Sequence, residues 1–138
     1  MIVGAAITKR PDLFKVAVPK VGLFDLIGTK DYGNEFGSIY NSEEFDYRLN
    51  LSPVHHVKNE GTYPAMLIVT AENDDRVPSF NSFKFTALLQ NTSNNSNPIM
   101  LRVEERAGHF GASNYAGWVE EMAEIYSFIF HNMGVKPK

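Results

Sequence analysis

Apolar positions along the 138-residue chain form short runs that alternate with segments of helical spacing. The longest unbroken apolar run, residues 63–71, is typical of a parallel strand covered by helices on both faces. Residues 99–103 and the β-branched stretch 14–22 predict two further short strands. Because strands and helical segments alternate, the pattern predicts an α/β fold in which parallel strands are flanked by helices.

Two segments in the second half of the chain have apolar residues at helical spacing. The first has apolar side chains at Phe80, Phe83, Ala87 and Leu88. The closing helix carries an apolar stripe of Trp118, Met122, Ile125, Tyr126, Ile129 and Met133. We expect Glu121 and the neighbouring glutamates to form its solvated face and Gly134 to end it.

Two other segments are less regular. Residues 1–8 are small and apolar, and no capping residue precedes them. They therefore look like part of a buried helix that is cut before its N-terminal cap. Residues 25–53 contain scattered glycines and aromatic residues, which predicts a long ordered loop with one helical turn. Loops of this kind often line binding sites.

Composition removes several classes of function. The chain has no cysteine, which excludes disulfides, thiolate zinc sites and cysteine nucleophiles. The net charge of −3 gives no basic face for nucleic acid, and no apolar run approaches the ~20 residues of a membrane span. The adjacent pair His55 and His56 lacks further ligands at metal-binding spacing. We therefore expect no cofactor, no metal, no nucleic-acid or membrane partner, and a cytoplasmic location.

Polar residues follow two of the predicted strands. Asp74 comes shortly after the strand at 63–71, and His109 follows the strand at 99–103. Functional groups gather at the carboxyl ends of parallel strands, and an acid followed by a histidine is the chain order of an α/β-hydrolase triad whose serine comes earlier. Spacing alone leaves alternatives open, because Asp74 and Asp75 could cap the next helix and His109 could be an ordinary loop histidine.

Five segments of the chain carry a family resemblance. They are residues 10–14 (RPDLF), 52–57 (SPVHHV), 63–67 (YPAML), 74–78 (DDRVP) and 107–109 (AGH). In this order and with these gaps, the sequence resembles the prolyl oligopeptidase family of serine peptidases nearly from end to end.

The resemblance implies a role for three of these residues. Asp74, the first aspartate of the Asp-Asp-Arg motif, corresponds to the triad acid, and His109 corresponds to the base. Arg76 corresponds to the arginine that holds a carbonyl of a peptide substrate on the N-terminal side of its proline. A proline-containing peptide is therefore the expected substrate.

The resemblance also implies an aromatic and aliphatic pocket for that proline. Tyr32 stands where the family has a tryptophan that stacks on proline, Phe36 replaces a tyrosine, Leu23 replaces a common valine, and Val77 fits the family pattern. These changes predict a proline preference that is retained but loosened. The oligopeptidase B group, which cuts after basic residues, ranks second, because Glu35 is the only nearby acidic candidate.

In the family, the serine-bearing Gly-Gly-Ser-Asn-Gly-Gly segment immediately precedes the residues that match 1–3. By the resemblance, residues 1–138 correspond to the C-terminal part of a peptidase catalytic domain without its nucleophile, its oxyanion tyrosine or the propeller domain. We expect such a chain to be inactive alone. Two other interpretations stay open: a small-ester hydrolase of the same fold, which would not need Arg76, and a non-catalytic module whose sheet edge pairs with another polypeptide.

Overall fold

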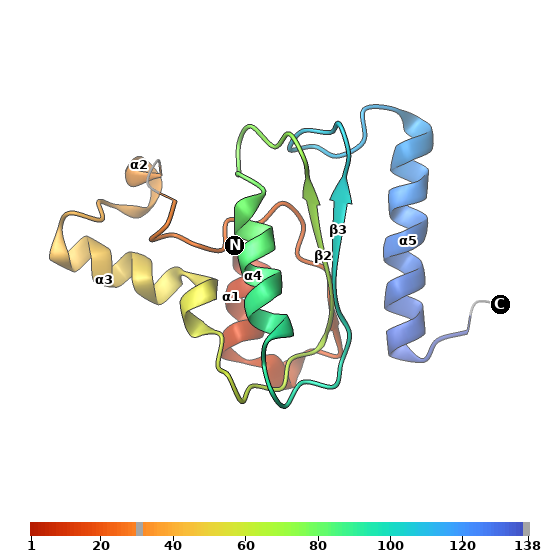
Figure 1. Cartoon of the computed structure of the whole chain (residues 1–138), viewed down its shortest axis with the longest axis horizontal. Helices are drawn as coiled ribbons and strands as arrows, with labels where there is room; N and C mark the ends of the chain where they lie inside the picture. Colours follow the sequence, from red (N-terminus) through yellow and green to blue (C-terminus); the bar gives the residue numbers. More distant parts are fainter. Residues whose placement is uncertain (30–31, 137–138) are drawn as a thin grey trace.

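The computed structural model, which describes residues 1–29 and 32–136, contains an open three-stranded sheet with helices around it (Figure 1). The strands are β1 (Val16–Ala17), β2 (Ala65–Ala71) and β3 (Ile99–Glu104), in the order β1-β2-β3, and both pairings are parallel. The α/β architecture with parallel strands is therefore confirmed.

The helices lie before, between and after these strands. They are α1 (Ile2–Lys9), α2 (Gly33–Phe36), α3 (Ser42–Leu51), α4 (Phe80–Gln90) and α5 (Tyr115–Met133), with 3₁₀ turns at Pro11–Leu13 and Pro53–His56. Among the described residues, no helix combines the length and the apolar character needed to cross a bilayer.

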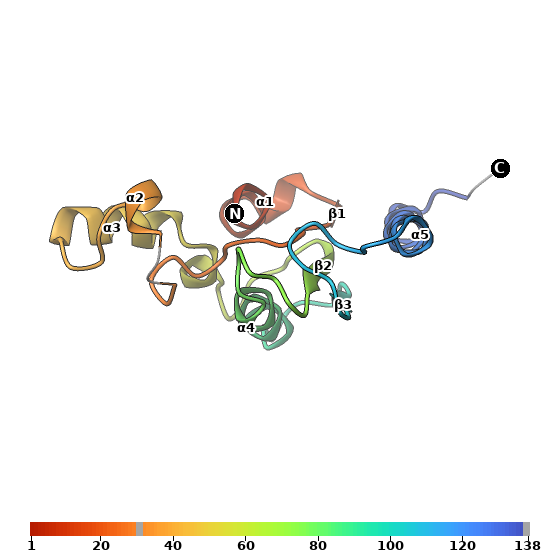
Figure 2. The ribbon, with the colours of Figure 1, turned by 90° about the horizontal axis from the view of Figure 1, so that it is seen from above.

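Strand β2 forms the centre of the core, and all seven of its residues are buried. Met66 and Ile68 belong to one apolar cluster, together with residues of α1 and α4. Leu67 and Val69 point the other way and pack with Ile125 of α5. Helices α4 and α5 therefore lie against opposite faces of the sheet, as the view along the strands shows (Figure 2).

The predicted strand at 14–22 is much shorter in the structure. Regular pairing is limited to Val16–Ala17, and Lys20 forms only an isolated bridge with Val69. Pro19 has no N–H to donate, and Val21 has a φ of 41°, so neither residue fits a regular ladder.

Residues 25–53 are more helical than the predicted loop with one helical turn. Besides the short α2, they contain the ten-residue α3, which Asn41 precedes. The Asn41 side chain accepts hydrogen bonds from the N–H groups of Glu43 and Glu44 at 3.0 and 3.2 Å, as an N-cap residue does. The apolar pattern does not predict α3, because the single buried residue of this helix is a charged one, Arg48.

Helix α5 ends as predicted, with Gly134 in the left-handed conformation at φ 71°. Its predicted faces are partly wrong. Trp118, Tyr126 and Met133 of the expected buried stripe are about half exposed. Glu121, expected in solvent, is 1% exposed, because its carboxylate forms an ion pair with Lys20.

Candidate functional site

The structure brings Asp74 and His109 into direct contact. Strands β2 and β3 are parallel neighbours, with Ala71 opposite Glu104, so the loops that follow them leave the same edge of the sheet. His109 Nδ1 lies 2.9 Å from Asp74 Oδ2 and 3.0 Å from Oδ1, although the two residues are 35 positions apart.

The carboxylate of Asp74 is held by the His109 ring and by backbone N–H groups. Its side chain is fully buried, and Oδ1 also accepts hydrogen bonds from the N–H groups of Arg76 at 3.0 Å and Val77 at 2.8 Å. It does not cap α4, whose N-cap is Ser79 and receives no side-chain cap. Asp75 beside it is exposed, and in the described part of the chain its side chain makes no hydrogen bond.

The contact with Asp74 determines the chemistry of the His109 ring. A carboxylate only accepts hydrogen bonds, so Nδ1 carries the hydrogen and the lone pair of a neutral ring is on Nε2. Within residues 1–29 and 32–136, Nε2 makes no hydrogen bond, and the side chain is 19% exposed. The ring of Phe110, which is 90% exposed, meets the imidazole edge to face at 5.5 Å. The pair is therefore arranged as an oriented base with a free nitrogen.

Two hydrogen bonds donated by backbone N–H groups join the two loops that carry the pair. The N–H of Asn73 donates to the carbonyl of Ala107 at 3.0 Å, and the N–H of Arg106 donates to a carboxylate oxygen of Glu72 at 3.1 Å. Because these bonds lie directly before Asp74 and His109, they limit the relative movement of the two side chains.

An ion pair between a buried glutamate and a partly exposed lysine lies next to the His109 loop. Lys20, after β1, pairs with Glu121 of α5, and both groups approach Gly111. Gly111 has a φ of 86°, a conformation that favours glycine, and a Cβ here would also lie close to Glu121 Oε2, at 3.0 Å. The prediction of a solvated Glu121 is wrong, because nothing in the local sequence pattern marks this glutamate as buried.

The residues predicted to form the proline pocket come together in one apolar cluster. Leu23, Leu26 and Val77 are buried in it, and Tyr32 and Phe36 pack against them. Met1 and Leu51 complete this cluster, which we call the pocket cluster.

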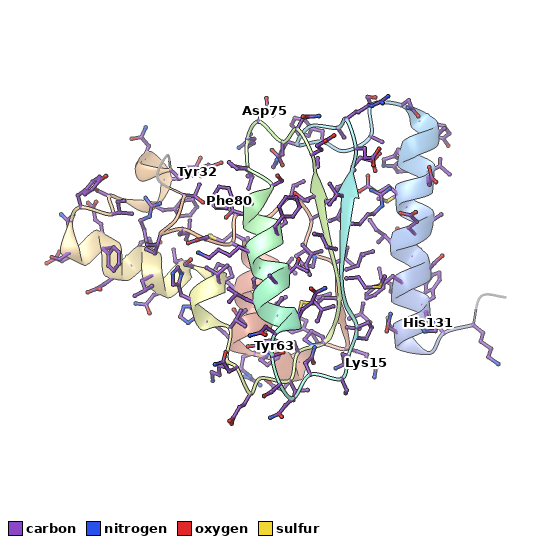
Figure 3. The ribbon with its side chains drawn as sticks, in the orientation of Figure 1. Lys15, Tyr32, Tyr63, Asp75, Phe80 and His131 are labelled. Carbon is purple, nitrogen blue, oxygen red and sulfur yellow. The ribbon has the colours of Figure 1, made fainter. Side chains whose placement is uncertain are left out.

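The pocket cluster is linked to the Asp74 loop. The hydroxyl of Tyr32 donates a hydrogen bond to the backbone carbonyl of Arg76. In Figure 3, Tyr32 and Asp75 both lie toward the end of the molecule at which the arrows of β2 and β3 terminate. Arg76 is exposed, and its guanidinium makes no hydrogen bond or ion pair within the described residues.

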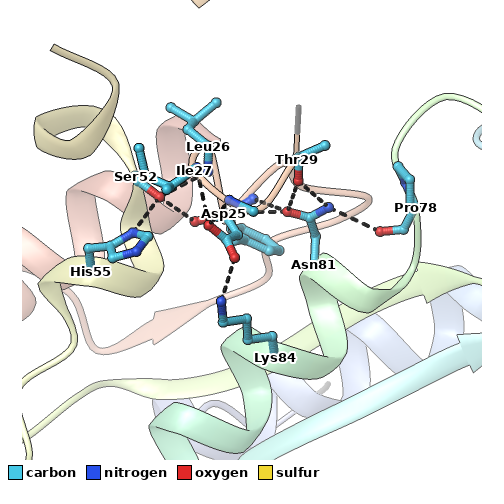
Figure 4. A network of polar contacts seen from close by, with 11 residues as sticks. Asp25, Leu26, Ile27, Thr29, Ser52, His55, Pro78, Asn81 and Lys84 are labelled. Atoms are coloured by element: carbon cyan, nitrogen blue, oxygen red, sulfur yellow. Dashed lines mark hydrogen bonds and ion pairs between the residues drawn. The ribbon is translucent and has the colours of Figure 1, made fainter. Parts of the chain in front are cut away.

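A polar network behind the pocket cluster fixes the turn after Leu23 (Figure 4). Asn81, fully buried on α4, accepts hydrogen bonds from the N–H groups of Phe24 at 3.1 Å and Asp25 at 2.9 Å. Burial raises the pKa of Asp25, but Lys84 at 2.5 Å and the N–H of Gly28 lower it by more, so the net pKa is below the ordinary 3.8.

His55 belongs to the same network through Ser52. Its Nδ1 lies 2.9 Å from Ser52 Oγ, and partial burial lowers its pKa although Asp25 acts in the opposite direction. Ser52 is 0% exposed, so this serine–histidine contact is closed to a substrate. Among the described residues, no group of three His, Cys, Asp or Glu side chains could hold a metal ion.

Comparison with known proteins places these features in a family context. Residues 1–136 match the sequence description of the prolyl oligopeptidase family. A prolyl endopeptidase of Elizabethkingia meningoseptica is 38% identical over 143 residues, which cover 99% of this chain and 20% of that protein. The chain thus spans about a fifth of the length of the curated relatives it matches.

Solved structures give the same result. A prolyl endopeptidase chain superposes with a TM-score of 0.93 at 36% identity, covering 98% of this chain and 21% of its own length. Oligopeptidase B from Trypanosoma brucei with covalently bound antipain superposes with a TM-score of 0.92 at 28% identity, covering 99% of this chain and 20% of its own length.

Proposed function

The chain belongs to the prolyl oligopeptidase family, and from this membership and the geometry of Asp74 and His109 we propose that it supplies the acid, the base and part of the substrate pocket of a serine peptidase. The observation that carries the proposal is the contact of His109 Nδ1 with the buried Asp74 carboxylate at 2.9 Å. It leaves Nε2 free to act on a serine hydroxyl.

In the acylation step, Nε2 of His109 takes the proton of the serine hydroxyl while the serine oxygen attacks the substrate carbonyl carbon. The imidazolium that forms is stabilised by the Asp74 carboxylate, which itself stays ionised. His109 then gives the same proton to the leaving amine, and the C–N bond breaks. A water molecule, deprotonated by His109, hydrolyses the acyl-enzyme, and the proton returns to the serine.

The substrate groups beside the scissile bond would meet the pocket cluster and Arg76. An aromatic face such as that of Tyr32 suits a pyrrolidine ring, and apolar side chains exclude water from it. The Arg76 guanidinium has donors available for a substrate carbonyl, because its side chain is exposed and unpaired among the described residues. We propose cleavage after proline in short peptides.

We propose that the serine is supplied by a segment joined to Met1. In support, Met1 packs in the pocket cluster with Val77, whose N–H binds the Asp74 carboxylate. Residues attached at Met1 would therefore lie beside the pocket and on the side of the acid.

A chimaera tests the proposal. In it, this chain replaces the matching stretch of the Elizabethkingia meningoseptica prolyl endopeptidase, so that Asp74, Arg76 and His109 are the residues used. We expect the folded chimaera to cleave an internally quenched peptide after proline and the His109→Ala chimaera to lose that cleavage. A folded chimaera without activity, or a His109→Ala chimaera with full activity, would contradict the proposal.

Cleavage after basic residues is the second candidate, because oligopeptidase B from Trypanosoma brucei superposes so closely. It would require an acidic group at the pocket. Glu35, the candidate acid, is exposed on α2. The same chimaera, given matched peptides with proline or lysine before the scissile bond, distinguishes the two, and we expect it to prefer proline.

A further inference from the structure

Helix α3 is attached to the rest of the molecule in an unusual way. Of its ten residues, only Arg48 is buried, and this side chain is 0% exposed. An arginine is rarely fully buried unless its donors are satisfied. The buried guanidinium of Arg48 therefore needs hydrogen-bond acceptors around it.

Those partners are three backbone carbonyls. Arg48 Nε donates to the carbonyl of Leu26 at 2.8 Å, and Nη2 donates to the same carbonyl and to that of Thr29 at 2.8 Å. Nη1 donates to the carbonyl of Gly37 at 2.7 Å. Within the described residues, no carboxylate pairs with this guanidinium. Carbonyl dipoles thus take the place of an acidic partner.

In the sequence, the residues that provide these carbonyls lie on either side of Tyr32 and Phe36, two members of the pocket cluster. Leu26 and Thr29 precede Tyr32 in the chain, and Gly37 directly follows Phe36. The rigid guanidinium fork therefore joins the two ends of the segment that carries both aromatic side chains.

A second side chain of α3 reinforces this attachment. Glu44, one helical turn before Arg48, accepts a hydrogen bond from the N–H of Ser38 at 2.5 Å. The two residues lie on the same face of α3 and bind the carbonyl of Gly37 and the next N–H along the chain. Gly37 has a φ of 83°, which shows that the backbone turns sharply at this anchor.

We propose that Arg48 is a positioning residue that fixes Tyr32 and Phe36 as the aromatic wall of the substrate pocket. The fixed wall would recognise a proline ring without first paying the entropy of ordering the segment. The part of the inference that concerns substrate rests on the proposed function, whereas the structural part can be tested without any activity.

Hydrogen exchange of the chain itself tests the structural part. We expect Arg48→Met, which keeps the stem length and removes every donor, to accelerate exchange at residues 32–37 by about tenfold or more while the amides of β2 stay protected. Arg10→Met is the matched control, because Arg10 is exposed and its only ion pair among the described residues is with Asp12, and it should leave residues 32–37 unchanged. Unchanged exchange in a folded Arg48→Met chain overturns the inference.

Arg48→Lys covers the case in which Arg48→Met does not fold. Lysine keeps the charge, but its ammonium cannot span three carbonyls as the fork does. We expect faster exchange at residues 32–37 in this variant as well, and protection equal to that of the unsubstituted chain overturns the inference.

The chimaera tests the link to substrate. We expect Arg48→Lys to lower the ratio of kcat/KM for proline over alanine before the scissile bond by about tenfold, mainly through KM. A loss of folded enzyme would instead reduce kcat equally for both peptides, and that result, with KM unchanged, overturns the role in recognition. If the unsubstituted chimaera is inactive, the proposed function fails, while the exchange result still decides the structural part.

Discussion

The hydroxyl of Tyr32 donates a hydrogen bond to the backbone carbonyl of Arg76. It connects α2 and its surroundings to the loop after β2, two regions 44 residues apart. This bond therefore joins the tyrosine predicted to contact proline to the arginine predicted to hold the neighbouring substrate carbonyl.

Removing this hydroxyl should weaken substrate binding moderately. Tyr32→Phe keeps the ring but loses a hydrogen bond of about 0.5–1.5 kcal/mol, so we expect kcat/KM of the chimaera for a proline peptide to fall by about two- to tenfold. Tyr40→Phe is the control, because Tyr40 is 87% exposed. Equal effects of the two substitutions on kcat/KM would show that the Tyr32 bond plays no part in binding.

The Lys84–Asp25 pair should make the stability of the chain depend on pH. Lys84→Met leaves the buried Asp25 carboxylate without its cation, and because Lys84 is half exposed we expect a loss of about 1–2 kcal/mol at pH 7. The folded-state pKa of Asp25 is below 3.8, so its contribution is present above that pH and is lost as the pH falls through the folded value.

Urea unfolding of the chain and of the Lys84→Met variant at pH 7 and pH 3 measures this effect. We expect the difference in unfolding free energy between them to be smaller at pH 3. Lys58→Met is the control, because Lys58 is exposed and unpaired among the described residues. A difference that is the same at both pH values would exclude an electrostatic origin.

Phe110 should contribute little to folding in spite of its size. Its ring is 90% exposed, so we expect Phe110→Ala to change the unfolding free energy by no more than about 0.5 kcal/mol. Phe85→Ala is the comparison, because Phe85 is 0% exposed and stacks on Phe24 at 4.5 Å, and it should cost about 3–5 kcal/mol. A large loss from Phe110→Ala would mean that the ring is covered in solution.

The sequence predicts the central parts of this fold because their signals are local. The apolar run of β2 reflects burial of a regular strand, and the polar residues after β2 and β3 mark the site because parallel strands end at one edge. The helical spacing of Phe80, Phe83, Ala87 and Leu88 correctly predicts a helix, α4, but these four residues are exposed, and the buried face carries others such as Phe85 and Leu89. The resemblance to a family selects Asp74 over Asp75, and the structure places Asp74 against His109.

The sequence does not predict the buried charged residues whose partners lie far away in the sequence. Glu121 and Arg48 lie in patterns that indicate solvent, and they are buried because Lys20 and the carbonyl of Leu26 meet them after folding. In each case the two partners lie too far apart in the sequence for the pattern of a single helix to include both. The same limitation explains why α3, whose single buried residue is Arg48, was predicted as loop.

The most direct test of the central claim compares two adjacent aspartates in the chimaera. Asp74 is buried against His109 Nδ1, and Asp75 is exposed beside it. We predict that Asp74→Asn lowers kcat for a proline peptide by about 10⁴-fold, because the amide no longer holds the imidazole in the reactive tautomer. Asp75→Asn should change kcat by less than about twofold, as a surface substitution does. Equal kcat values for the two variants would contradict the assignment of Asp74 and His109 as acid and base.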